Sequence, residues 1–242
     1  TTAVVGEAPG RTEVSLGRPF VGPSGMELQR ALEASGHGRQ ELLITNSLCC
    51  WPSDIKDMAS LHAQLNARNA NRAAAGLPPH KSPETCCAPR LRNEFLSAGI
   101  SQIIALGAAS TKAVVPGLRS GILDIRGGPL ETWQDTANGA FAATPLAGGR
   151  ALKVLPTIHP AFVLRSPRWR QAFDVDMARA WRFFGNQLTW RDPQVRWQPS
   201  PVDLAAYLGV VRSLEGRWMA GETTPKAFDY ETDSLRPLLC NV

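Results

Sequence analysis

The sequence lacks the features of a membrane-spanning or secreted protein. It contains no run of 18 apolar residues, which a helix would need to cross a bilayer. No segment is built like a secretory signal peptide. It also lacks an initiator methionine, and Thr1 stands directly before an apolar run. We therefore expect a protein with no membrane partner, cut from a longer polypeptide.

Cysteine is scarce, and its arrangement is unusual. The five cysteines are Cys49, Cys50, Cys86, Cys87 and Cys240. Their number is odd, four of them form adjacent pairs that rarely bridge to each other, and no secretory signal is present. A disulfide framework is therefore not expected. Metal binding and simple burial both remain open.

Charged residues are also few, at 19% of the chain, whereas hydrophobic residues make up 43%. This balance predicts a packed core rather than disorder. The net charge is +5 and the basic residues are unevenly distributed. Between Arg165 and Arg196 there are seven arginines and three acidic residues. Such a segment suits phosphate contacts or forms a solvated helix face, and composition does not separate the two.

Segments typical of strands and of helices alternate along the chain. The expected strands are 2–5, 41–46, 102–106 and 154–158. The expected helices are 24–35, 83–98, 108–115 and 168–186. Residues 51–82 are polar and rich in Ala and Asn, which is typical of an insertion. This order predicts a three-layer α/β/α fold with a mostly parallel, four-stranded central sheet.

Polar residues follow three of these strands. Glu7, Asn46 and His159 each stand at or just past a strand end. Ligands of such folds bind at the carboxyl ends of the strands. We therefore expect these three side chains to share one site.

Three segments carry a family resemblance. They read GEAPGRTEVSLGRPFVGPSG at 6–25, TNSLCCWP at 45–52 and HPAFVLRSP at 159–167, with supporting matches ALGAAS at 105–110 and IRGG at 125–128. Together they resemble the uracil-DNA glycosylase superfamily, specifically its iron–sulfur-containing family 4 branch. The resemblance covers roughly residues 1–186 and implies base flipping into a closed pocket.

The resemblance implies a base-binding role for several residues. Phe20 would be the stacking floor for the flipped base, although a core aromatic is the alternative. Asn46 would read the base edge, accepting from N3–H and donating to O4; the alternative is a cap after a strand. Backbone amides of the turn that contains Gly6 and Ala8 would contact the base. Glu13 resembles the second family acid, near C5 of the base.

The resemblance also implies the catalytic groups. His159 would donate a hydrogen bond to the charge that develops on O2, although a structural histidine is the alternative. Glu7 would position or activate water and stabilise the cationic sugar. Other branches carry Asp where Ala8 stands, so that carboxylate is not carried over to this chain.

Two further features follow from the resemblance. The segment 160–165 would be a loop that presses into the DNA groove, with Leu164 as an apolar wedge and Arg165 as a phosphate contact. Cys50 and Cys87 would be two of the four ligands of a 4Fe–4S cluster, with Cys49 and Cys86 as neighbours. The other two ligands would lie before Thr1 in the parent protein.

The C-terminal segment AFDYETDSLRP at 227–237 resembles the first motif of the 3′–5′ exonuclease domain of family A DNA polymerases. Asp229 and Glu231 would hold Mg²⁺ or Mn²⁺ in a complete exonuclease, but further ligands lie outside this chain. An ordinary surface strand is the alternative. The expected organisation is a glycosylase-like domain at 1–188, a linker at 189–200 and the start of an exonuclease domain, a second α/β domain, at 201–242.

The sequence thus predicts a monomeric DNA repair glycosylase that hydrolyses uracil from DNA, fused to a DNA polymerase in the cytoplasm of a bacterial or phage-infected cell. A non-catalytic module that senses uracil or tethers a polymerase to DNA is the alternative. A generic nucleotide-binding α/β domain is a third interpretation.

Overall fold

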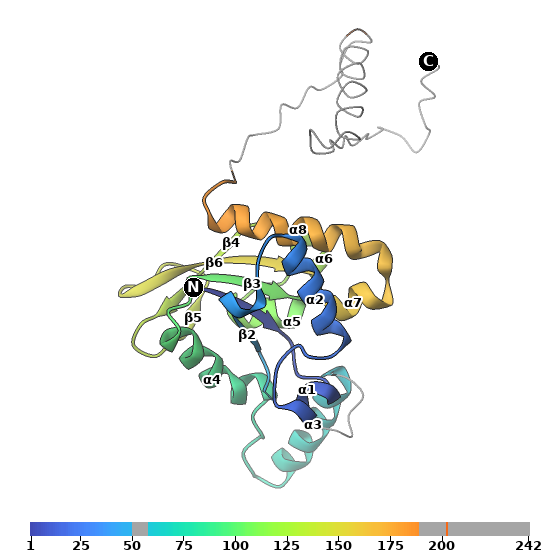
Figure 1. Ribbon diagram of the computed structural model, residues 1–242. Coiled ribbons are helices and arrows are strands. Elements are labelled where there is room, and N and C mark those ends of the chain that lie inside the picture. Colours follow the sequence, from blue (N-terminus) through green and yellow to red (C-terminus); the bar gives the residue numbers. More distant parts are fainter. Residues whose placement is uncertain (50–57, 189–201, 203–242) are drawn as a thin grey trace. The chain divides into compact units, whose positions relative to one another are not determined.

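The structure is a computed structural model that describes residues 1–49, 58–188 and 202 (Figure 1). The chain divides into two units, Thr1–Thr189 and Trp190–Val242. The fold described below is that of the first unit.

A six-stranded sheet in the order β2-β1-β3-β6-β4-β5 lies at the centre of this unit. The first four strands of this order are parallel, β4 runs antiparallel to β6, and β5 runs antiparallel to β4. The strands are β1 (Thr2–Gly6), β2 (Leu42–Asn46), β3 (Gln102–Leu106), β4 (Leu130–Asp135), β5 (Phe141–Ala142) and β6 (Gly149–Thr157).

Helices cover both faces of the sheet (Figure 1). Because successive strand side chains point to opposite faces, Val4 and Ile104 join one core while Val5 and Ile103 join the other. The first core includes residues of α2 (Pro23–Ala34), α7 (Pro160–Arg165) and α8 (Arg170–Phe184). The second includes residues of α4 (Pro83–Ser97) and α5 (Ala108–Val114). The predicted three-layer α/β/α class is confirmed.

The predicted number of strands was wrong, since the sheet has six strands rather than four. The two additional strands, β4 and β5, form its antiparallel edge. The buried face of β4 carries Thr132 and Gln134, both fully buried. Gln134 accepts from the Arg150 guanidinium at 2.6 Å. A strand whose buried side chains are polar has no apolar alternation to reveal it.

The remaining elements are short or polar. They are α1 (Arg11–Leu16), η1 (Arg39–Glu41), α3 (Met58–Ala74), α6 (Ile122–Ile125) and η2 (Pro167–Trp169). The segment 160–165, expected as a loop, is instead helix α7. Pro160 occupies its first turn, where the missing N–H costs nothing, and His159 caps it. The polar insertion contains helix α3.

A buried ion pair fixes the end of β6 to α8. Asp176 of α8 is 2% exposed and accepts from Arg126 at 2.7 Å and from the Thr157 hydroxyl at 2.7 Å. Thr157 is the last residue of β6, and its backbone carbonyl oxygen accepts the Gly107 N–H at 2.7 Å. Charge pairing and hydrogen bonds together satisfy the buried carboxylate. This network, which we call the Asp176 network, anchors the strand end that leads into His159.

Candidate active site

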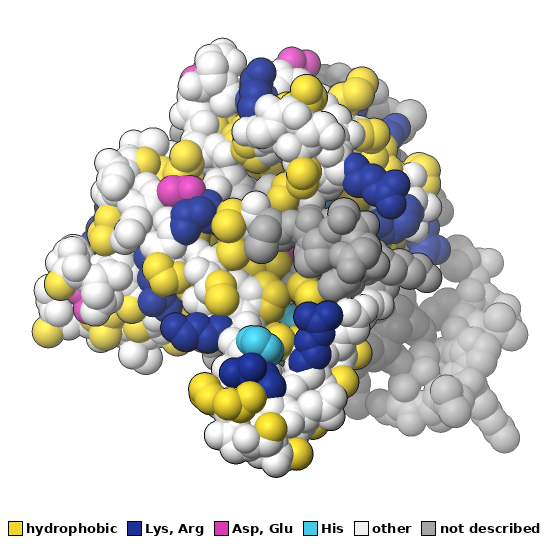
Figure 2. All heavy atoms as spheres, turned by 90° about the horizontal axis from the view of Figure 1, so that it is seen from below, with side chains coloured by type: hydrophobic (Ala, Val, Ile, Leu, Met, Phe, Trp, Pro, Cys, Tyr) yellow, Lys and Arg dark blue, Asp and Glu magenta, His cyan; other side chains and the backbone are white. Residues whose placement is uncertain are grey.

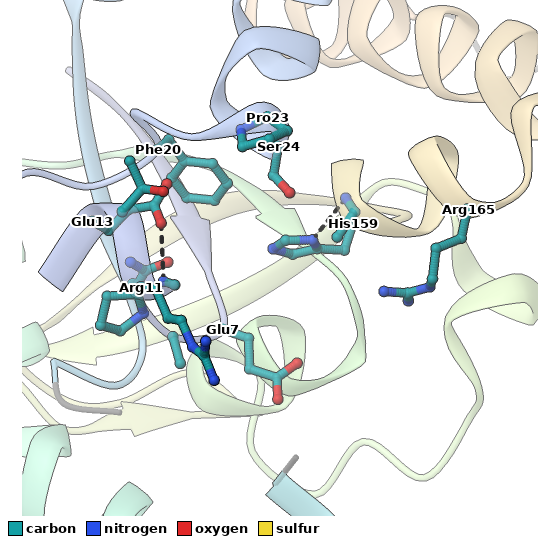
Figure 3. A pocket seen from close by; sticks show the side chains of 14 residues that line it. Glu7, Arg11, Glu13, Phe20, Pro23, Ser24, His159 and Arg165 are labelled. Carbon is teal, nitrogen blue, oxygen red and sulfur yellow. Dashed lines mark hydrogen bonds between the residues drawn. The ribbon is translucent and has the colours of Figure 1, made fainter. Parts of the chain in front are cut away.

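A cavity of about 500 Å³ opens at the carboxyl ends of the parallel strands (Figure 3). It brings together seven of the predicted site residues, among them Glu7, Phe20, Asn46 and His159. Glu7 follows β1, Asn46 ends β2 and His159 follows β6. The remaining lining residues are Ala8, Pro9, Gly10, Arg11, Thr12, Glu13, Pro23, Ser24, Ala161 and Arg165.

The His159 imidazole is held in one tautomer. Its Nδ1 accepts the backbone N–H of Ala161 at 3.1 Å, so the proton of the neutral ring resides on Nε2. Burial, helped by the charge of Arg165, lowers the pKa of His159 to about 4. The ring is therefore neutral at neutral pH, and its Nε2–H remains available as a donor.

The Asn46 side chain is buried with an unused acceptor. The residue is 7% exposed, and among the described residues its Oδ1 atom has no hydrogen-bond partner. A buried acceptor without a partner costs about 1–3 kcal/mol. Such a cost is typical of an atom kept for a ligand.

Arg90 of α4 supports the backbone at Asn46. Its guanidinium donates to the carbonyl oxygens of Asn46 and Ser47, and also to the Thr45 hydroxyl at 3.1 Å. Glu94, one helical turn further along α4, accepts from both Arg90 and Thr45. Arg90 therefore fixes the backbone at the end of β2, and the Oδ1 atom of Asn46 has no hydrogen-bond partner among the described residues.

Phe20 forms one wall of the cavity with a strained backbone. It is 5% exposed and has φ of 53°, in the left-handed region that bulky residues avoid at a cost of about 1–3 kcal/mol. Its ring centroid lies 5.8 Å from that of His159. A Cβ on Gly6 would lie 2.4 Å from both the Phe20 ring and Asn46 Oδ1. Only glycine at position 6 lets these two groups meet.

The carboxylate of Glu7 is half-buried at the cavity. Burial raises its pKa above the ordinary value of 4.5; Glu84 raises it further and His62 opposes the shift. Glu84 and His62 pair with each other at 2.8 Å, across α4 and α3. The Arg11 side chain extends toward Glu7 in Figure 3. A carboxylate with a raised pKa is suited to proton transfer.

Glu13 lines the cavity, but both its carboxylate oxygens are engaged by the backbone. Oε2 accepts the Gly10 N–H at 3.1 Å, and Oε1 accepts those of Val21 at 3.1 Å and Gly22 at 2.8 Å. The family resemblance predicted a place for Glu13 near C5 of the base; in the structure its carboxylate fixes the loop before α2.

The other predicted residues lie around this centre. Gly6 and Ala8 flank Glu7, and Ala8 lines the cavity. Arg165 lines it from α7, and Leu164 beside it is 40% exposed. Four cavity residues, Arg11, Thr12, Pro23 and Ser24, were missed because nothing in their local pattern distinguishes them from ordinary loop and cap residues.

The described cysteines place two thiols side by side. Cys49 Sγ lies 3.4 Å from Cys87 Sγ, and Cys87 is buried. The sequence had assigned Cys50 with Cys87 and left Cys49 as a neighbour; Cys50 lies outside the described residues. Within those residues no group of three or more His, Cys, Asp or Glu could hold a metal. Two thiols fall short of the four that a 4Fe–4S cluster needs. Asp229 and Glu231 also lie outside the described residues.

The fold and the cavity together define an α/β protein with a cavity at the carboxyl ends of its parallel strands, lined by an aromatic ring and by polar side chains. The family described as the uracil DNA glycosylase superfamily matches residues 2–184 of this chain. The chain therefore belongs to the uracil DNA glycosylase superfamily. None of the described helices combines the length and apolar character needed to traverse a bilayer.

Several curated proteins are similar to this chain. The type-4 uracil-DNA glycosylase of Pyrobaculum aerophilum is 31% identical over 185 residues, covering 76% of this chain and 77% of that protein. The type-4 uracil-DNA glycosylase of Thermotoga maritima is 31% identical over 162 residues, covering 67% and 65%. That of Saccharolobus solfataricus is 28% identical over 176 residues, covering 72% and 67%.

Proposed function

We propose that this protein is a monofunctional uracil-DNA glycosylase that hydrolyses the N-glycosidic bond between uracil and deoxyribose. One observation carries the proposal. The unpartnered Oδ1 of Asn46, the Phe20 ring and the neutral His159 line one cavity together with Glu7. This set matches the donors, acceptors and flat face of uracil.

The Asn46 amide would select the base. Its Oδ1 would accept uracil N3–H, and its NH₂ would donate to O4. Cytosine presents the opposite pattern, with an acceptor at N3 and a donor at C4. A bound cytosine would leave buried polar groups unpaired, at about 1–3 kcal/mol each. Phe20 would stack on the base face, and Gly6 leaves room for the amide and the ring to meet.

His159 and Glu7 would act on the two products of bond cleavage. As the C1′–N1 bond breaks, its electron pair moves onto uracil, and the His159 Nε2–H stabilises the charge on O2. The sugar becomes cationic, and the Glu7 carboxylate faces it. Glu7 then orients a water molecule whose oxygen bonds to C1′, while the water proton passes to Glu7 or to solvent.

The rim of the cavity would contact DNA. Arg11 and Arg165 are exposed on its lining, and the exposed Leu164 stands beside Arg165. Figure 2 shows a face on which Lys and Arg side chains lie at several separate places while Asp and Glu are sparse. Basic side chains bind phosphates and an apolar wedge fills the gap left by a flipped nucleotide.

Release of uracil from a labelled single-stranded oligonucleotide tests the proposal. We expect release by the native chain and loss of release in His159→Ala. Leu123→Ala is a matched control, because Leu123 is half exposed on α6 and does not line the cavity. Uracil-dependent binding without release would instead favour the sensing or tethering module. Equal binding of free nucleotides and DNA would favour a generic nucleotide-binding domain.

We also propose the domain organisation of the chain. Residues 1–188 form the glycosylase domain, 189–200 a linker and 201–242 the start of an exonuclease domain of a fused polymerase. A truncated chain of residues 1–188 should keep uracil release at the level of the full chain. A loss of folding in the truncated chain would contradict these boundaries.

A further inference from the structure

The backbone of Phe20 requires an explanation that the chemistry of uracil does not supply. Among the described residues, two non-glycine residues have a positive φ: Phe20, and Asn186 just after α8. Asn tolerates this region, whereas a bulky aromatic residue does not. Something in the structure must hold Phe20 in this conformation.

We propose that Arg39 is a positioning residue which, opposite Glu13, clamps the loop at Phe20 and so sets the ring that faces the cavity. This inference rests on the proposed function, because it concerns the wall on which uracil would stack. The sequence around Arg39 contains no pattern that predicts this positioning role. The residue begins the short helix η1, between α2 and β2.

Arg39 holds the carbonyl side of the loop. Its Nη1 donates to the carbonyl oxygen of Phe20 at 2.6 Å, and its Nη2 donates to that of Pro19 at 2.5 Å. The guanidinium is half-buried. Burial, followed by the charge of Arg18, lowers the pKa of Arg39, so the protein keeps this cation in an unfavourable place. A planar fork with two donors suits two neighbouring carbonyls.

Glu13 holds the amide side of the same loop. Its Oε1 accepts the N–H groups of Val21 and Gly22. The peptide unit before Phe20 is thus held through the Pro19 carbonyl, and the unit after it through the Phe20 carbonyl and the Val21 N–H. Since φ and ψ describe rotation between these two peptide planes, fixing both planes fixes the conformation of Phe20.

Helix α2 packs directly against the backbone of Phe20. A Cβ on Gly25 would lie 1.9 Å from the Phe20 carbonyl oxygen, so the loop rests directly on bare helix backbone. The Phe20 ring in turn lies against Gly6, at the point where a side chain would collide with it. When the Arg39 bonds are absent, Phe20 can relax to negative φ, and its ring leaves the cavity wall.

The clamp is tested with three variants of the full chain. Arg39→Met removes both bonds, and Arg39→Lys retains the charge but only a single ammonium. Arg72→Met is the matched control, because Arg72 also donates to a backbone carbonyl, that of Pro78, and does not line the cavity. Each is assayed by hydrogen exchange of the peptide 17–22, inhibition by free uracil, affinity for DNA with an abasic site, and single-turnover release of uracil.

We expect Arg39→Met to speed exchange in 17–22 and to weaken inhibition by free uracil about tenfold, the effect of releasing a strained residue. Single-turnover release should fall by a similar factor. Affinity for abasic DNA, which has no base to stack, should stay within about twofold. Arg39→Lys should lie between Arg39→Met and the native chain, and Arg72→Met should match the native chain in all four.

Unchanged exchange and unchanged uracil inhibition in Arg39→Met would overturn the clamp. Equal losses of uracil and abasic-DNA binding would also overturn it, because they indicate general unfolding. If Arg39→Met does not fold, Arg39→Lys decides by the same comparison. A native chain that releases no uracil overturns the proposed function, whereas the exchange measurement still tests the clamp.

Discussion

The side chain of Asn46 offers a substitution with opposite expected effects on stability and activity. Leucine has nearly the shape of asparagine but no polar atoms. In the free protein, Asn46→Leu removes a buried Oδ1 that has no partner among the described residues. Such an atom costs about 1–3 kcal/mol, so the variant should be as stable as the native chain or up to about 2 kcal/mol more stable. The Arg90 bond to the Asn46 carbonyl does not involve the side chain and should persist.

With substrate bound, the same change has a cost. Uracil N3–H and O4 would each face a methyl group, at about 1–3 kcal/mol per group. The sum of about 2–6 kcal/mol corresponds to a loss of roughly 30-fold to 3 × 10⁴-fold in kcat/KM. Denaturant unfolding gives the stability, and single-turnover release from a uracil oligonucleotide gives the activity. A clear loss of stability would refute the reasoning, since it would show that the oxygen already has a structural partner.

The other predictions concern the remaining groups of the cavity. His159→Ala should lower kcat about 10²–10³-fold by removing one donor to the developing anion, and should lower stability by about 1 kcal/mol because α7 loses its cap. For the native chain, kcat/KM should fall as the pH drops through the raised pKa of Glu7, above 4.5, because the carboxylate must be ionised; the His159 pKa of about 4 contributes only below that. Glu7→Gln should remove this acid limb from the pH profile, and a limb that persists would point to another group. Arg90→Met should cost about 1–3 kcal/mol of stability by leaving two carbonyl groups without a donor, and it should lower kcat/KM about tenfold. Arg90→Lys should restore part of both. Native activity in Arg90→Met would show that the position of Asn46 does not depend on Arg90.

The parallel part of the fold could be predicted because its signals are local. Runs such as Ala3–Val5 and 103–106 are apolar on both faces, as buried parallel strands must be. The polar residues at the ends of these strands then meet for topological reasons. For that reason, Glu7, Asn46 and His159 were found together from the sequence.

The missed elements depend on contacts that no local pattern encodes. Strand β4 buries Thr132 and Gln134, which are satisfied by partners far along the chain, such as Arg150. Helix α1 has no buried residue and shows no amphipathic pattern. The supports of the site, Arg39 and Arg90, act through backbone carbonyls of other segments, and an arginine that does so looks like any surface arginine in the sequence.

The Asp176 network has a consequence for how this protein would fail on heating. Helix α8 and the last residue of β6 share one enclosed carboxylate, and His159 follows that residue almost immediately. Helix α8 therefore cannot separate from the sheet while His159 keeps its position in the cavity. The loss of activity and the unfolding of the domain should therefore show the same temperature dependence. No inactive but folded intermediate should accumulate.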